Sequence, residues 1–202
     1  MIGTAGAEQL RITVYDKALL RGELTETVVD ELRRILRRSG IDIEWTKGVL
    51  TSAEASLMIY ESHSRGHDQE IACRARRDVA LDIIPVAPPG HNPQALGMSQ
   101  PFARMGLNVR VFYGRIRVAS DREGRPEATV LAHVLAHEIG HVLLRSNAHT
   151  KHGLMTDVWD DFEYDWMRKG LMFFTAEQSR KMRETLRGDG CQVAESADTR
   201  NL

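Results

Sequence analysis

Four short segments have the hydrophobic pattern of β-strands. Alternation of apolar and polar residues is typical of a strand with one buried face, and a short apolar run is typical of a strand buried on both faces. The four segments are Arg11–Tyr15, Ile41–Trp45, Ala55–Tyr60 and Val79–Val86. Because helical patterns occur along the same chain, we expect an α/β (α+β) fold with a mixed, twisted sheet.

A fifth strand is expected at Asn108–Ala119, where the alternation is strong. Val109 and Val111 share one face, and the pattern resumes one residue out of step at Ile116. A bulge at Gly114 would account for this shift, and bulges favour edge strands. We therefore expect an edge strand beside the central helix, where it could pair with an extended peptide.

Apolar positions at helical spacing predict further elements. A first helix is expected at about Thr25–Arg38, and a last helix from a capping box at Thr175 to about Arg187. The arginines of the first helix flank an apolar stripe and are balanced by acidic residues, which is typical of a solvated face. The central helix, about Glu127–Leu144, is apolar on nearly all sides and is therefore expected to be buried.

This central helix contains the motif HEIGH at His137–His141. Residues four apart project from the same helix face, so His137 and His141 can bind one ion. Glu138 lies next to them, where a general base could take a proton from a metal-bound water. Unpaired imidazole and carboxyl groups are costly in a buried helix, which favours a metal site. Gly140 is a weak helix former that permits close approach of another chain segment.

A zinc site with these two histidines needs a further ligand, which we expect after the helix. His149 is the preferred candidate, provided that the helix ends near residues 144–146 and the chain doubles back. His152 is also within reach, Glu163 on a later helix is an alternative, and the amide of Asn147 is a poor zinc ligand beside imidazole. Acidic residues that could orient a ligand histidine follow: Asp157, Asp160 and Asp161.

The remaining histidines are not expected to bind this ion. His133 lies one helical turn before His137 and is interpreted as a packed or supporting residue. His91 lies in a segment rich in Gly, Pro and Asn and is expected at the surface. His63 and His67 could bind a second ion, but they lie in a polar, turn-like segment that is poorly suited to that role.

The motif at His137–His141, together with Met155, resembles the metzincin group of zinc peptidases. That group has the pattern H-E-x-x-H-x-x-G-x-x-H, followed by a tight turn with a methionine beneath the metal. This chain departs from the pattern, because Leu144 replaces the glycine and Asn147 replaces the third histidine, and His149 gives H-E-x-x-H-x₇-H instead. The resemblance implies a divergent zincin-like catalytic domain with one Zn²⁺ ion. The residues implied are the metal ligands His137, His141 and His149 and the catalytic Glu138.

Composition adds limits to this interpretation. With 202 residues, 42% of them hydrophobic, the chain fits a single domain, with flexible ends expected at 1–9 and 189–202. A net charge of −1 argues against nucleic-acid binding, and no apolar run approaches the ~20 residues of a membrane span. Cys73 and Cys191 could pair or remain free thiols. The N-terminus lacks a signal-peptide pattern, which makes a cytoplasmic protein the default, although a secreted protein trimmed of its signal would look the same.

The function expected from these features is zinc-dependent hydrolysis of peptide bonds, as in a metalloendopeptidase-like metallopeptidase with a peptide or protein substrate. Glu138 would act as the general base on the zinc-bound water and pass the proton to the leaving amine. One alternative is a non-catalytic, zinc-stabilised binding domain, in which His149 and His152 both bind the metal. Another is a zinc hydrolase that acts on a different amide.

Overall fold

The structure is a computed structural model that describes residues 6–49, 77–102 and 107–188. Its strands are β1 (Glu8–Asp16), β2 (Ile41–Lys47), β3 (Asp78–Ile84), β4 (Gly97–Ser99) and β5 (Leu107–Phe112). Its helices are α1 (Gly22–Arg37), α4 (Tyr113–Glu123), α5 (Glu127–Leu144), α6 (Asp161–Arg168) and α7 (Ala176–Arg187). Several features considered above lie outside the described residues: the strand expected at Ala55–Tyr60, His63, His67, Cys73 and Cys191.

The strands form one five-stranded sheet in the order β2-β1-β3-β5-β4. The pairs from β2 to β5 are parallel, and the short strand β4 runs antiparallel to β5 at one edge. The register places Ile12 beside Val79 and Leu81 beside Val109, so apolar residues of neighbouring strands share one face. The prediction of a mixed α/β sheet is therefore confirmed.

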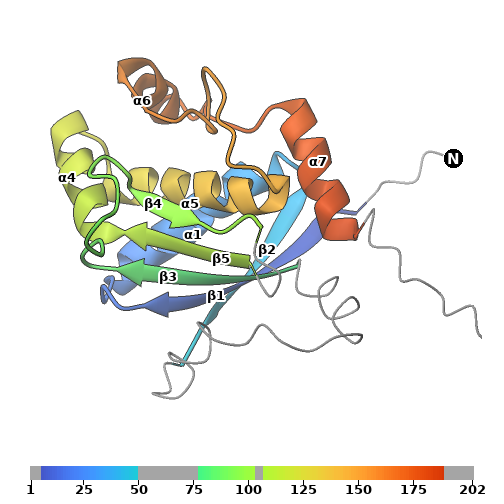
Figure 1. Ribbon diagram of the computed structural model, residues 1–202, viewed down its shortest axis with the longest axis horizontal. Coiled ribbons are helices and arrows are strands. Elements are labelled where there is room, and N and C mark those ends of the chain that lie inside the picture. Colours follow the sequence, from blue (N-terminus) through green and yellow to red (C-terminus); the bar gives the residue numbers. More distant parts are fainter. Residues whose placement is uncertain (1–5, 50–76, 103–106, 189–202) are drawn as a thin grey trace, which may run out of the picture.

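The described helices cover one face of this sheet (Figure 1). On that face α5 packs against α1, β4 and β5, and it lies between the sheet and α6 (Figure 1). The strand residues that point toward the helices are almost completely buried: Leu10, Ile12, Val14, Ile41, Ile43, Val79, Leu81, Ile83, Leu107, Val109 and Val111. Most alternate residues on the same strands are polar or charged, which explains why the sequence shows alternation even though most of the sheet is parallel.

The prediction of a strand at Asn108–Ala119 is wrong for its second half. The strand β5 ends at Phe112 and α4 begins at Tyr113. Gly114 marks a close approach of two backbones, since its N–H donates to Pro85 O at 3.1 Å and an added Cβ would lie 2.6 Å from the same oxygen. The edge position is also wrong, because β5 lies between β3 and β4, and β4 forms the edge of the described sheet.

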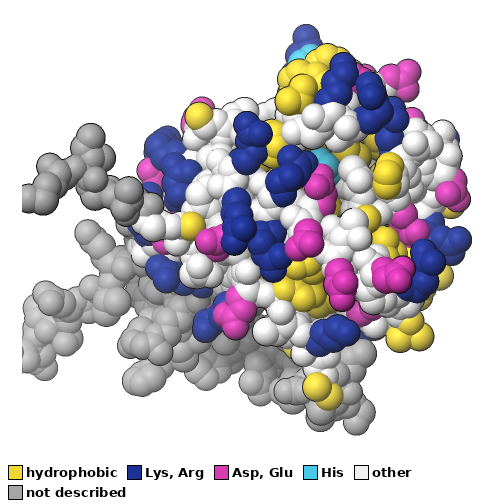
Figure 2. All heavy atoms as spheres, turned by 180° about the vertical axis from the view of Figure 1, so that it is seen from behind, with side chains coloured by type: hydrophobic (Ala, Val, Ile, Leu, Met, Phe, Trp, Pro, Cys, Tyr) yellow, Lys and Arg dark blue, Asp and Glu magenta, His cyan; other side chains and the backbone are white. Residues whose placement is uncertain are grey.

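The interpretation of the first helix as charged on its outer side is supported by its ion pairs. Arg33 pairs with Asp30 at 2.8 Å, and Arg34 pairs with Glu31 at 2.6 Å. Seen from behind, Lys and Arg side chains lie interspersed with Asp and Glu side chains (Figure 2). The positive charges of Arg33 and Arg34 are therefore balanced by acidic side chains on the same surface.

Part of the N-terminal end that was expected to be flexible belongs to the sheet. Glu8 and Gln9, which were expected in a flexible end, belong to β1, where Glu8 is paired with Ile41 of β2. The tail at 189–202 lies outside the described residues. Within the described ranges, no helix combines the length and the apolarity that crossing a membrane requires.

Candidate metal centre

Helix α5 carries the HEIGH motif, and the conformation at its C-terminus sets the direction of the segment that follows. The helix begins at Glu127 after Pro126 and ends at Leu144, as the sequence predicts. Arg145 then adopts a left-handed conformation with φ 50°, and its N–H donates to His141 O. Because that conformation reverses the chain, Ser146 and the residues after it return toward the imidazoles of α5.

The structure brings together the histidines His137, His141 and His149. They form a group of three whose potential ligand atoms all lie within 4.8 Å of one another. The Nε2 atom of His141 lies 3.0 Å from that of His137 and 3.1 Å from that of His149. Among the described residues, no other group of His, Cys, Asp and Glu has this potential metal-binding geometry.

Backbone carbonyls fix the protonation of two of these rings. The Nδ1 atom of His137 lies 2.7 Å from Leu154 O, and the Nδ1 atom of His141 lies 2.7 Å from Ser146 O. A carbonyl oxygen can only accept, so each Nδ1 carries the hydrogen and each Nε2 presents a lone pair. Burial lowers the pKa of His137 to about 4 and also lowers the pKa of His141, which keeps both rings neutral at pH 7.

The resulting arrangement fits a divalent metal ion. Lone pairs of His137 and His141 that face each other at 3.0 Å repel unless a cation lies between them. Tetrahedral zinc with Zn–N bonds of about 2.0–2.1 Å separates its nitrogen ligands by about 3.3 Å, close to the observed spacing. Hydrogen bonds from the second ring nitrogen to backbone carbonyls are typical of metal-binding histidines.

The third imidazole lies on the solvent side of the group. The side chain of His149 is 32% exposed, and its Nδ1 lies 3.7 Å from Asp157 Oδ1. The ring of Trp159 packs edge-on against His137, with ring centres 5.9 Å apart. The group is therefore buried at the helix and open at His149, which would leave access for water or a substrate.

The alternative ligands named from the sequence are not brought to this group. His152 Nδ1 faces Glu163 Oε1 at 3.5 Å instead. The same Glu163 carboxylate accepts from the backbone N–H of Gly153 at 3.4 Å and belongs to the capping box that begins α6 at Asp160. Glu163 therefore holds the loop against α6.

Two further histidines also have other contacts. His133 is fully buried, with its Nδ1 2.8 Å from Thr129 O. His91 lies with its Nδ1 3.1 Å from Pro88 O and its Nε2 3.1 Å from the sulfur of Met98 on β4. Neither residue belongs to the group of three.

Met155 packs directly against the motif helix. A Cβ added at Gly140 would lie 2.6 Å from Met155 Sδ and 2.7 Å from a ring carbon of Phe174. The expectation that Gly140 permits close approach of another segment is therefore confirmed. Thr150 N–H donates to Met155 O at 2.8 Å, which closes the loop that carries both His149 and Met155.

Glu138 lies on α5 next to the imidazoles and faces β4. Its side chain is almost buried, with 7% of the residue exposed. Burial raises the pKa of the Glu138 carboxyl to about 7, while a hydrogen bond with the Ser99 side chain lowers it. A carboxyl group with a pKa in this range can both accept and release a proton near neutral pH. Sequence analysis could not identify Ser99, because no local pattern relates β4 to α5.

Comparisons with known proteins bear on the fold. No protein-family model matches the sequence, and no curated protein matches it. Among solved structures, archaemetzincin from Methanopyrus kandleri aligns with a TM-score of 0.53 and 16% identity, over 93% of this chain and 99% of that chain. A zinc-dependent peptidase from Methanocorpusculum labreanum aligns with a TM-score of 0.51 and 16% identity, over 85% of this chain and 99% of that chain. Metalloproteinase-II from Bacteroides fragilis gives a TM-score of 0.50 and 12% identity, over 90% of this chain and 55% of that chain. At these identities the likeness establishes a common fold.

Proposed function

We propose that this protein is a zinc-dependent metallopeptidase. The observation that carries the proposal is the convergence of three imidazoles, two of them held by backbone carbonyls, beside a buried glutamate. The fold shared with proteins described as zinc-dependent peptidase and metalloproteinase supports the same conclusion. The proposed metal ligands are His137, His141 and His149.

Zinc held by these residues would lower the pKa of a bound water toward about 7 and polarise the carbonyl of the substrate. Glu138 is the group on this chain that accepts the proton of the attacking water and then delivers it to the leaving amine. The positive charge of a zinc ion held by the adjacent imidazoles would favour the carboxylate form of Glu138, which is the base. A ligand set of three histidines leaves one coordination position free, as catalytic zinc sites do.

A peptide is the substrate class that the surroundings of Glu138 favour. Strand β4 packs against α5, and within the described residues it pairs only with β5. Its outer edge can therefore accept an extended peptide by backbone hydrogen bonding. The edge strand beside the helix is β4, and not β5 as expected from the sequence.

A closed, non-catalytic zinc site receives less support. Such a site would need His152 as a fourth ligand, but its Nδ1 lies 3.5 Å from Glu163, which is itself tied to Gly153 and Asp160. The solvent exposure of His149 also favours an accessible metal. We therefore propose that the site is a catalytic centre of metzincin-like type, with a methionine turn at Met155.

The proposal is tested with the zinc-loaded protein and a peptide library analysed by mass spectrometry. We expect the wild type to cleave peptides and Glu138→Gln to lose turnover by more than about a thousandfold, because the amide cannot accept a proton. Zinc content should remain one ion per chain in both proteins. Glu127→Gln, at the start of the same helix, is the matched control and should keep the wild-type rate. Cleavage by Glu138→Gln at the wild-type rate would contradict the proposed role of Glu138.

A further inference from the structure

Strand β4 contacts Glu138 through two residues of one strand face. Gly97 and Ser99 are two positions apart, so both point toward α5. A Cβ added at Gly97 would lie 2.9 Å from both Cγ and Oε1 of Glu138, and 3.0 Å from Arg110 O. The strand therefore approaches the side chain of Glu138 so closely that a larger residue at this position would displace it.

Ser99 provides the polar contact from the same strand. The register places its side chain on the same strand face as Gly97, toward Glu138, and its hydroxyl lowers the pKa of the Glu138 carboxyl as a hydrogen-bonding partner does. The hydroxyl donates when Glu138 is ionised, because a carboxylate can only accept. Since Glu138 is nearly buried, bulk water cannot replace this donor freely, and a buried carboxylate without a donor is costly.

The opposite face of β4 is anchored independently of Glu138. The sulfur of Met98 lies 3.1 Å from His91 Nε2, and the His91 ring packs edge-on against Phe112 at 5.5 Å. The antiparallel register pairs Gly97 with Val111 and Ser99 with Val109. These contacts fix the strand that carries Ser99, so the hydroxyl meets Glu138 from a rigid element.

We propose that Ser99 is a positioning residue that holds the Glu138 carboxylate in one orientation for proton transfer, in the space that Gly97 leaves free. This inference rests on the proposed function of Glu138 as a general base. It assigns a second role to the edge strand. A peptide that pairs with β4 would lie on the same strand that orients the base, so substrate register and base orientation are fixed by one element.

The first test compares Ser99→Ala and Ser99→Thr with Ser179→Ala in the zinc-loaded full chain. Ser179 is a buried serine of α7 whose hydroxyl hydrogen-bonds to that of Ser39 at 2.9 Å, so it is the matched control. Turnover is measured with one peptide that the wild type cleaves in the library, and the orientation of Glu138 is determined in crystal structures of each variant. We expect Ser99→Ala to lower kcat about tenfold with little change in KM, the effect of losing one hydrogen bond to a charged group. Glu138 should then occupy more than one conformation. Ser99→Thr keeps the hydroxyl and should restore both properties, and Ser179→Ala should match the wild type.

A second test uses Gly97→Ala, which adds a methyl group close to Glu138 without removing the Ser99 hydroxyl. We expect Glu138 to be displaced in its crystal structure and kcat to fall by more than in Ser99→Ala. Zinc content, measured by mass spectrometry, should remain one ion per chain in every variant, because none of these residues lies in the group of three histidines.

An unchanged kcat together with an unchanged, single conformation of Glu138 in Ser99→Ala would overturn the inference. It would also be overturned if Ser179→Ala were as slow as Ser99→Ala, because the loss of any buried serine hydroxyl would then explain the lower kcat. Failure of the proposed function is distinguishable, since it would be seen as full activity of Glu138→Gln. The conformation of Glu138 in the crystal structures tests its positioning by Ser99 even in that case.

Discussion

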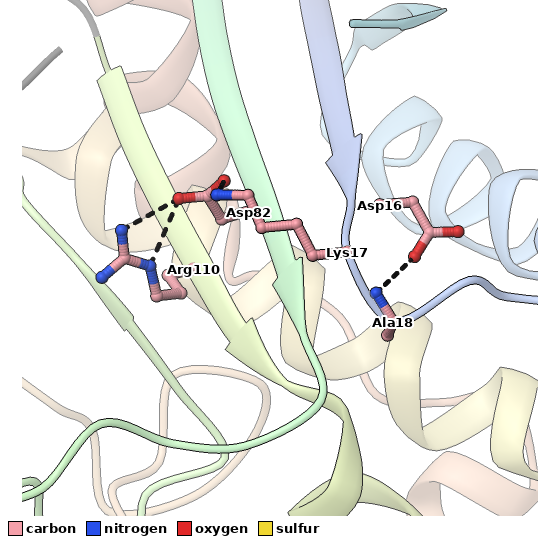
Figure 3. Close-up of polar contacts among 5 residues, drawn as sticks. All are labelled: Asp16, Lys17, Ala18, Asp82 and Arg110. Carbon is pink, nitrogen blue, oxygen red and sulfur yellow. Dashed lines mark hydrogen bonds and ion pairs between the residues drawn. The ribbon is translucent and has the colours of Figure 1, made fainter. Parts of the chain in front are cut away.

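Two carboxylates on opposite sides of the sheet have opposite electrostatic environments. Asp82 of β3 lies on the face away from the helices, where it binds Lys17 at 2.9 Å and Arg110 at 2.9 Å (Figure 3). Burial raises the pKa of Asp82, but hydrogen bonds and positive charge from these two partners outweigh burial, so the net pKa is lowered. Glu138 lies in the helical layer, where burial dominates and the pKa is raised to about 7.

This difference distinguishes a structural ion pair from a group suited to proton transfer. Asp82 remains ionised at neutral pH and ties β3 to the end of β1 and to β5. Glu138 has a hydroxyl donor and lies next to imidazoles whose lone pairs converge, so its charge can change during a reaction. The comparison predicts that substitutions of the three histidines and of Glu138 affect metal binding or turnover, whereas Asp82→Asn, on the sheet face away from the described helices, affects stability alone.

The largest effect is expected for His141→Ala, whose Nε2 lies near both other imidazoles. Zinc affinity should fall by more than about a hundredfold, which exceeds the usual cost of removing a supporting hydrogen bond behind a ligand. Asp82→Asn and His152→Ala should bind zinc like the wild type. Isothermal titration calorimetry with zinc measures the wild type and these three variants, together with His149→Ala, which should also lose affinity. Zinc loss in His152→Ala with retention in His149→Ala would contradict the assigned ligand set.

An intermediate effect is expected for Gly140→Ala, which tests the packing beneath the motif. The new methyl group would lie 2.6 Å from Met155 Sδ and 2.7 Å from Phe174. Overpacking should exceed the gain in helix propensity and lower the free energy of unfolding by about 1–2 kcal/mol. Gly22→Ala, at the start of α1, is the control, because an added Cβ there meets nothing within 4 Å. Urea unfolding of the metal-free proteins gives the comparison, and equal stability of the two variants would contradict it.

The smallest effect is expected for Asp82→Asn, which should cost about 1 kcal/mol or less. Because the folded-state pKa of Asp82 is lowered, its stabilisation is complete above the unfolded-state pKa of about 3.9. It is lost as the pH falls through the folded-state pKa, where Asp82 becomes protonated. The stability difference between wild type and variant, measured by urea unfolding, should therefore shrink below about pH 4. A difference that grows on acidification would contradict this assignment.

The sequence predicted those elements whose pattern is local. Helix α5 and the capping box of α7 at Thr175 were predicted correctly, because periodicity and caps involve residues close in the chain. The capping box of α6, Asp160 with Glu163, has the equally local sequence pattern D-x-x-E. Strand β4 has only three residues in a Gly- and Pro-rich segment, and its pairing with β5 is a tertiary contact.

The error at Asn108–Ala119 has a specific physical cause. The alternation of β5 happens to continue into α4, where Ile116 is buried and Val118 is 66% exposed. The change from strand to helix is set by the contact between Gly114 and Pro85, a residue far away in the sequence. The residues of the candidate site also differ in whether a local sequence pattern can predict them. His137 and Glu138 follow from a motif, whereas the contribution of Ser99 follows only from the packing of β4 on α5.

X-ray absorption spectroscopy of the zinc-loaded protein tests the central claim most directly, because it reports the ligands around the metal. The account predicts one zinc ion per chain with three imidazole nitrogens at about 2.0–2.1 Å and one further oxygen ligand. These nitrogens are assigned to His137, His141 and His149, the three histidines that converge in the structure. A protein that takes up no zinc, or a coordination shell with four imidazoles, would contradict the proposed catalytic centre.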